Sequence, residues 1–492
     1  MKTLHFLSNL FILSLWTTFS GFSQYEISLS MKTKNDTVML THIFAKEQSR
    51  YLDTTIVLKN GKGVFKGKKT LPKGLYAIYN NNRKIDILIG NSQKFGIVVD
   101  TVDIINNIRF ISSPDNDAFY DFFRYEIPHS AKMRQLEEQY KNAVDDTGKK
   151  TIIEQWQALG KERMSLIKKL INDNEHLYIS KFLKAMFVPL EIPEPPRDDL
   201  GRITDSTFQY RWYRTHFFDN YDIYDPDMLR TPLYEKKVTE YMTLMQNNHP
   251  LDTIYAEIDR MLAKSKPNKE VFRCMLATIY NHFINSNLLI RENFWVHLVD
   301  NWYVPYADWD VKVDEMKKAA DKIRPTLIGK VAPPLDQLML LSPDHFKAAA
   351  LDTAIKNEVH AGKIIPDFRK SIQSKYLVLL FWEVTCGHCK SAIQELWEIY
   401  QACKDKGLQV LAIQTLINRD GKVKWIDFIN EHGMYDWYNG WIIYDLKWHD
   451  LYIHGEGVPK VYLLNEKKEI VLRGNFKYEN IQIFIEADAA KK

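Results

Sequence analysis

The chain has 492 residues, of which 45% are hydrophobic and 26% are charged, a composition typical of folded globular proteins. One hydrophobic core does not support this length, so about two to four domains are expected. The formal net charge of +4 argues against a nucleic-acid-binding surface, and four cysteines are too few for a scaffold held together by disulfides.

Residues 1–23 have the pattern of a secretory signal peptide. Lys2 supplies the positive start, residues 4–19 are an apolar run, and residues 21–23 offer small side chains near the cut. We expect cleavage near Ser23, which would release a soluble protein into the periplasm if the source is a bacterium. An uncleaved inner-membrane anchor is the alternative.

Short β-prone runs separated by turn residues extend over residues 24–115. Strands are predicted at residues 37–43, 55–58, 63–67, 75–79, 85–89 and 95–99. Turn signals such as Asn60-Gly61 and Lys73-Gly74 separate them. Many short strands at this spacing favour an all-β, sandwich-like domain.

Residues 116–325 change to a helical period and predict an all-α domain. Helices are expected at residues 131–144, 150–172, 233–245, 251–264, 269–286, 292–303 and 310–323. Residues 208–224 are unusually aromatic, and either a peptide or glycan platform or packing between helices would explain them, packing being favoured. Cys274 lies in an apolar helical pattern and is expected to be a buried, inert thiol.

Residues 326–492 alternate strands with helices, which predicts an α/β domain. Strands are expected at residues 377–382, 408–413, 441–444, 460–465 and 469–474, and helices at residues 422–432 and 478–486. Residues 344–360 have a helical pattern and are interpreted as an insertion.

Cys386 and Cys389 stand where the apolar run 377–382 gives way to a helical pattern that extends to Cys403. A sulfur at a helix N-terminus faces unpaired N–H groups and the positive end of the dipole, which favour a thiolate. Cys389, one turn later, can attack a mixed disulfide formed at Cys386. The spacing therefore indicates dithiol/disulfide exchange.

A zinc half-site or a structural disulfide is the alternative for this cysteine pair. Zinc normally takes four ligands, and the remaining cysteines, Cys274 and Cys403, are isolated in helical patterns. We therefore expect no metal and no other cofactor.

The C-terminal pattern resembles the thioredoxin superfamily. The resemblance is carried by Phe381, Trp382, Cys386, Cys389, Lys390, Val458 and Pro459. It implies a thioredoxin-like domain in which a cis-proline loop lies opposite the cysteines, so that Val458 and Pro459 bind an extended substrate strand. Trp382 would pack beside the active site. Residues 329–335 further resemble the lead-in of the TlpA/ResA-like exported branch.

The preceding regions are similar to domains of unknown function in exported thioredoxin-like proteins of the Bacteroidetes type. The residues that carry the similarity are 53–54, 66–67, 71–76 and 100–101 in the β region, and 217–221, 229–233, 268–272, Tyr303 and 327–330 in the helical region. This resemblance would cover nearly the whole mature chain, but it implies no mechanism.

Two further side chains are candidates for tuning the site. Gly387 and His388 stand at the helix start, and a cationic or donating His388 would favour the Cys386 thiolate and a more oxidising couple; an exposed spacer is the alternative. Glu383 is a candidate proton carrier, unless it simply points to solvent. The family's buried acid, helix-kinking proline and later acid are replaced here by Leu380, Gln394 and Ala392.

The function expected from these features is a periplasmic thiol–disulfide oxidoreductase of the reductase or isomerase type. Client proteins with disulfides or thiols and a membrane-embedded electron donor are its expected partners. A partner-binding scaffold with a secondary redox domain is one alternative. A thiol peroxidase is another, although it would need a threonine where Glu383 stands.

Overall fold

The computed structural model describes residues 23–100, 102–358, 362–442, 447–454, 457–474 and 476–490. The predicted targeting segment thus lies outside the described residues as far as residue 22. The chain divides into two compact units, one formed by Met1–His249 and Ala263–Met275 and the other by Pro250–Leu262 and Leu276–Lys492. The predicted domain limits at residues 116 and 326 stay a prediction.

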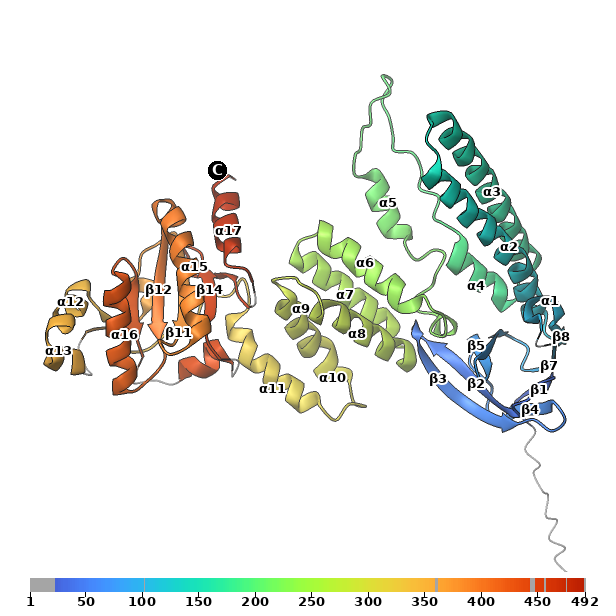
Figure 1. The fold of residues 1–492 in the computed structure, drawn as a ribbon, viewed down its shortest axis with the longest axis horizontal. Helices are drawn as coiled ribbons and strands as arrows, with labels where there is room; N and C mark the ends of the chain where they lie inside the picture. Colours follow the sequence, from blue (N-terminus) through green and yellow to red (C-terminus); the bar gives the residue numbers. More distant parts are fainter. Residues whose placement is uncertain are drawn as a thin grey trace, which may run out of the picture. The chain divides into compact units, whose positions relative to one another are not determined.

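The first unit begins with two four-stranded sheets, drawn in blue in Figure 1. One has the order β4-β1-β7-β8 and the other β3-β2-β5-β6. The strands are β1 (Tyr25–Met31), β2 (Thr37–Phe44), β3 (Lys46–Val57), β4 (Lys62–Gly67), β5 (Gly74–Asn80), β6 (Arg83–Ile89), β7 (Lys94–Val99) and β8 (Arg109–Ile111). Ile27, Phe65 and Ile78 bring side chains from both sheets into one hydrophobic core.

Three strands of this region differ from expectation, one of them β8, which was not predicted. β1 was not predicted, although its buried and exposed residues alternate. β3 begins at Lys46, whereas the prediction began at residue 55. The strand lies at the edge of its sheet, where charged side chains can reach solvent, so its first half resembles a loop in the sequence.

Helices follow the sheets in the first unit. They are α1 (Ile104–Asn107), α2 (Pro114–Asn142), α3 (Asp146–Asp173), α4 (Tyr178–Phe187), α5 (Phe208–His216), a 3-10 turn (Pro226–Met228) and α6 (Tyr234–Asn248). Figure 1 shows α2 and α3 side by side as a long hairpin. α2 begins far before the predicted residue 131, because Pro128 is accommodated inside the helix.

The aromatic run 208–224 divides into two parts. Phe217 and Tyr221 are buried, and Tyr221 Oη donates to the Met228 carbonyl at 3.0 Å. α5 itself has no buried residue. Packing therefore explains the second half of the run, and the aromatic side chains of α5 stay partly accessible.

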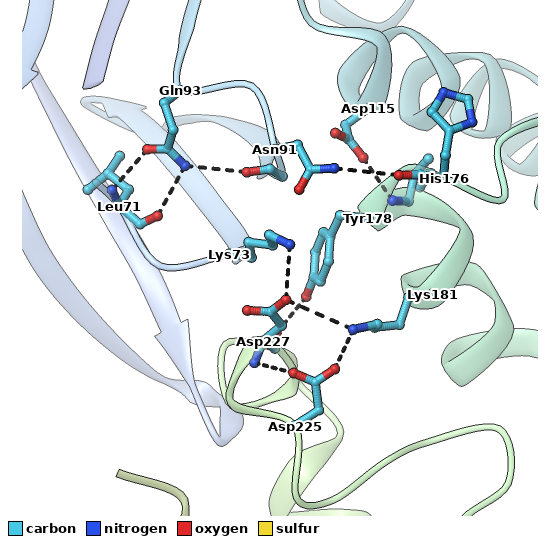
Figure 2. Close-up of polar contacts among 12 residues, drawn as sticks. Leu71, Lys73, Asn91, Gln93, Asp115, His176, Tyr178, Lys181, Asp225 and Asp227 are labelled. Carbon is cyan, nitrogen blue, oxygen red and sulfur yellow. Dashed lines mark hydrogen bonds and ion pairs between the residues drawn. The ribbon is translucent and has the colours of Figure 1, made fainter. Parts of the chain in front are cut away.

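A polar network joins the sheets to the helices of the first unit, as Figure 2 shows. Lys73 pairs with Asp227 at 3.2 Å, and Lys181 on α4 pairs with Asp225. The buried carboxylate of Asp115 accepts the Ile179 N–H at 2.9 Å and thereby satisfies a donor at the start of α4.

Gly74 and Arg230 form the closest approach at this junction. A Cβ on Gly74 would stand 2.2 Å from Arg230 Cβ, and the Leu75 N–H donates to the Arg230 carbonyl at 2.8 Å. The guanidinium of Arg230 pairs with Glu270 at 2.8 Å. Three of the segments singled out by resemblance, 71–76, 229–233 and 268–272, therefore meet around Arg230.

Helices α7 (Leu251–Ser265) and α8 (Lys269–Ile284) contribute to both units. The second unit continues with α9 (Arg291–Leu298), a π-helical turn (Val299–Tyr303), α10 (Val304–Tyr306) and α11 (Val313–Ile323). Arg473, which is 5% exposed, donates to the Thr326 carbonyl at 2.8 Å and pairs with Glu292 at 2.8 Å. This side chain ties the helices to the sheet that follows them.

The C-terminal sheet has seven strands in the order β10-β9-β13-β12-β11-β14-β15. They are β9 (Leu338–Leu341), β10 (Lys363–Ile365), β11 (Tyr376–Trp382), β12 (Leu408–Gln414), β13 (Tyr438–Trp441), β14 (Lys460–Leu464) and β15 (Ile470–Leu472). The accompanying helices are α12 (Pro343–Leu351), α13 (Thr353–Asn357), α14 (Phe368–Ser371), α15 (Gly387–Cys403), α16 (Arg419–His432) and α17 (Glu479–Ala489).

Helices cover both faces of this sheet. Val378, Leu380 and Trp382 face a core shared with α15, α16 and α17, whereas Leu377 and Leu379 face a second core shared with α14 and a π-helical turn at His449–Ile453. Figure 1 shows α15 and α16 beside β11 and β12. The arrangement is consistent with a thioredoxin-like domain.

Most predicted elements of this domain are confirmed. The sequence predicted a strand at residues 441–444, whereas β13 ends at Trp441. Its pairing with β12 matches Tyr438 to Leu411 and Trp441 to Gln414. Residues 443–444 lie outside the described part of the chain. β9 and β10 were not predicted. Within the described ranges, no helix is both long and apolar enough to cross a membrane.

Candidate active site

The site begins at the end of the most buried strand of the domain. Every residue of β11 is buried, and the strand pairs with β12 on one side and β14 on the other. An apolar strand between two neighbours can bury both of its faces. The chain turns at Glu383–Thr385 and enters α15 at Gly387.

Cys386 is the N-cap residue of α15. Its Sγ accepts the Cys389 N–H at 3.3 Å, one of the donors that a helix start leaves without an intrahelical partner. Cys386 is half-buried, whereas Cys389 is 0% exposed. Both cysteines are free thiols in this structure. An incoming sulfur can therefore reach Cys386 before Cys389.

Burial, together with a hydrogen bond to Cys386, raises the pKa of the Cys389 thiol to about 12. At neutral pH Cys389 thus keeps its proton and is a poor nucleophile. The two thiols differ in the way that sequential attack requires, with an accessible first sulfur and a buried second one.

The proline loop lies beside the first sulfur. The Val458–Pro459 bond is cis, and the Cys386 thiol donates to the Val458 carbonyl with a sulfur–oxygen distance of 3.8 Å. β14 begins at Lys460, directly after the loop, and Lys460 pairs with Phe381 at the end of β11. This register brings two segments separated by 72 residues to one point.

The other predicted site residues lie around the cysteines in different environments. Gly387 and His388 are exposed in the first turn of α15. Trp382 is 0% exposed and packs against Phe428, and the Lys390 ammonium lies 6.0 Å from the centroid of the same ring.

Glu383 is half-buried, and its carboxylate lies 3.5 Å from the Thr415 hydroxyl. It lines a groove of about 380 Å³ together with Thr415, Ile417, Trp448, His449, Asp450, Ile453, Gly457 and Val458. Apart from Glu383 and Val458, sequence reasoning missed these residues. The π-helical turn that carries several of them has no periodic signal that could have revealed it.

The remaining two cysteines are buried. Cys274 is 7% exposed, as predicted, and Cys403 is fully buried on α15, where burial raises the pKa of its thiol. No group of three or more metal-ligating side chains occurs in the part of the chain that the structure describes.

No family model matches the sequence, and no curated protein matches it. The solved structures that are similar to this chain include three from Bacteroides species. A thioredoxin-like protein from Bacteroides caccae is 18% identical over 61% of this chain and 99% of its own, with a TM-score of 0.40. The thioredoxin domain of a thiol-disulfide oxidoreductase from Bacteroides vulgatus is 21% identical over 32% and 97%, with a TM-score of 0.24. A thiol:disulfide interchange protein from Bacteroides sp. is 19% identical over 32% and 90%, with a TM-score of 0.24.

Proposed function

We propose that this chain is a thiol–disulfide oxidoreductase that exchanges disulfides with client proteins through Cys386 and Cys389. The observation that supports this function most is the position of Cys386 Sγ, which is reachable at the N-terminus of α15 and contacts both the Cys389 N–H and the Val458 carbonyl. A structural disulfide or zinc half-site would not need one reachable and one buried thiol beside a loop able to hold a peptide.

The reaction transfers two electrons from the enzyme dithiol to a client disulfide. The Cys386 thiolate attacks one client sulfur, forming a mixed disulfide and releasing the other client sulfur, which takes up a proton. Cys389 then loses its proton and attacks Cys386 Sγ, so that the enzyme disulfide forms and the second client sulfur leaves as a thiol. A dithiol donor restores the reduced enzyme, and the reverse sequence oxidises a client.

The backbone of the proline loop would hold the client. An extended peptide can pair with the backbone groups of the half-buried Val458, as in strand addition to a sheet edge. This pairing would place the client sulfur beside Cys386, because the Val458 carbonyl already lies 3.8 Å from that sulfur.

We further infer a TlpA/ResA-like protein that is exported to the periplasm and works in the reductase or isomerase direction. The lead-in 329–335 supports the subtype, since the Gly329 N–H donates to Ile470 of β15 at 2.8 Å and Ala332 is buried in the sheet core. Residues 1–23 support export to the periplasm. We further propose that a membrane-embedded protein is the electron donor. The proposed chain has three domains, which are a β domain at 24–115, a helical domain at 116–325 and a redox domain at 326–492.

Reduction of insulin disulfides by the mature chain (residues 24–492) tests the function. With dithiothreitol as donor, the wild type should accelerate precipitation of the insulin B chain, and Cys386→Ser should abolish the acceleration. Cys274→Ala removes a lone cysteine and should leave the rate unchanged. A wild type no faster than Cys386→Ser would reject the proposal and favour a scaffold role.

A further inference from the structure

The groove beside the active site begins at the reacting sulfur. Val458 lines the groove and also contacts Cys386 Sγ through its carbonyl. Glu383, at another part of the wall, is three residues before Cys386 in the sequence. A client chain held at Cys386 can therefore place a neighbouring side chain over this groove.

The wall of the groove has a rigid apolar part. Trp448 is 5% exposed, and its ring stacks on Phe381 at a centroid distance of 5.6 Å and an interplanar angle of 6°. Ile453 is 1% exposed and Ile417 is 38% exposed. These side chains offer a fixed surface for the methylene groups of a long side chain.

Two carboxylates lie on the same wall. Glu383 is half-buried near the cysteines, and Asp450 is 84% exposed at its side chain. His449 is the one basic residue among the described lining residues, and its ring lies 3.9 Å from Asp450. The groove therefore has an excess of negative charge over apolar walls.

We propose that this groove selects client disulfides in which a lysine or arginine lies within two residues of the attacked cysteine. The inference rests on the proposed exchange activity and adds a substrate preference to it. The aliphatic stem packs on Trp448 and Ile417, and the cationic group pairs with Glu383 and Asp450. Two residues of extended chain span about 7 Å, so a long basic side chain at this distance reaches the groove from Cys386.

Single-turnover oxidation of the reduced mature chain by three synthetic peptide disulfides tests this preference. The peptides differ only two residues from the cysteine, where they carry Lys, Gln or Glu. The Lys peptide should react about threefold faster than the Gln peptide and about tenfold faster than the Glu peptide at low salt, as partly exposed ion pairs allow. About 0.5 M salt should reduce these ratios.

Variants assign the preference to the groove. Glu383→Gln and Asp450→Asn should each lower the Lys-to-Glu ratio, and the double variant should bring it close to one. The matched control is Glu398→Gln, an exposed carboxylate on α15 outside the groove, which should keep the wild-type ratio.

The outcomes separate this inference from the proposed function. Equal rates for the three peptides would overturn the preference while leaving disulfide exchange intact. No reaction with any peptide would instead overturn the exchange activity. If Glu383→Gln slows all three peptides equally and keeps their ratio, Glu383 acts in proton transfer and its assignment to cation binding is wrong.

Discussion

The Cys389 N–H donates to Cys386 Sγ at 3.3 Å, so the backbone of the buried cysteine holds the sulfur of the reachable one. This contact lies at the start of α15. The first backbone N–H groups of a helix have no intrahelical acceptor, so they are available to bind the sulfur. One hydrogen bond thus joins the helix terminus, the proposed nucleophile and the second thiol, and the following predictions depend on that arrangement.

The mixed disulfide should accumulate when the second thiol is removed. Cys389→Ser leaves Cys386 able to attack but deletes the sulfur that releases the client, so covalent complexes should appear on non-reducing gels and their clients should be identifiable by mass spectrometry. Cys386→Ser is the control and should trap none. If both variants trapped clients equally, the assignment of the first attack to Cys386 would be wrong.

Alkylation should distinguish the two thiols in the reduced protein. Between about pH 7 and pH 9, iodoacetamide should modify Cys386 and leave Cys389 unmodified, because Cys389 is buried and its pKa is raised to about 12. Peptide mass spectrometry locates the label. Unfolding in guanidinium should remove the difference; early labelling of Cys389 in the folded chain would contradict the assigned roles.

The stability of the reduced protein should fall in alkaline solution through Cys389. Its folded pKa of about 12 exceeds the usual thiol value, so the stabilisation is present at neutral pH and is lost as pH rises from about 9 towards 12, where only the unfolded thiol ionises. The free energy of unfolding should drop by about 1–3 kcal/mol more in the wild type than in Cys389→Ser. Parallel pH profiles of the two proteins would contradict this.

His388→Pro should make the couple less oxidising. The exposed His388 stands in the first turn of α15, where a donating or cationic ring favours the Cys386 thiolate and thus the reduced protein. We expect the reduction potential to fall by about 20–40 mV in a glutathione titration. An unchanged potential would leave His388 as a spacer.

Gly74→Ala should destabilise the first unit without changing the redox couple. The new Cβ would meet Arg230 Cβ at 2.2 Å, and φ at Gly74 is +156°. We expect a loss of about 2–4 kcal/mol in urea unfolding. Gly160→Ala in α3 is the matched control, since a Cβ there meets nothing within 4 Å, and it should be neutral or stabilising. Equal stability of both variants would contradict a tight junction at Arg230.

The sequence predicted the candidate active site more completely than its surroundings. Strand 377–382, Cys386, Cys389 and Pro459 were recognisable because a buried strand, a helix start and a proline each leave a local signal. The meeting of Val458 with Cys386 was expected only through resemblance, since the β11–β14 register that produces it is a long-range property.

The parts that sequence reasoning missed depend on tertiary contacts. The groove residue Asp450 lies on a π-helical turn without an amphipathic repeat, and Trp448 directly precedes that turn. The Gly74–Arg230 approach joins two segments far apart in the chain. β3 was predicted too short because its exposed edge permits charged residues. Such features become visible only when the packing partner is known.

The most direct test of the central claim is a thiol–disulfide titration of the mature chain in glutathione buffers of graded potential, read by alkylation and mass spectrometry. The account predicts one two-electron transition in which Cys386 and Cys389 become linked, and its loss in either serine variant. The account would be contradicted if Cys386 and Cys389 stayed as thiols across the whole series, or if either of them paired with another residue.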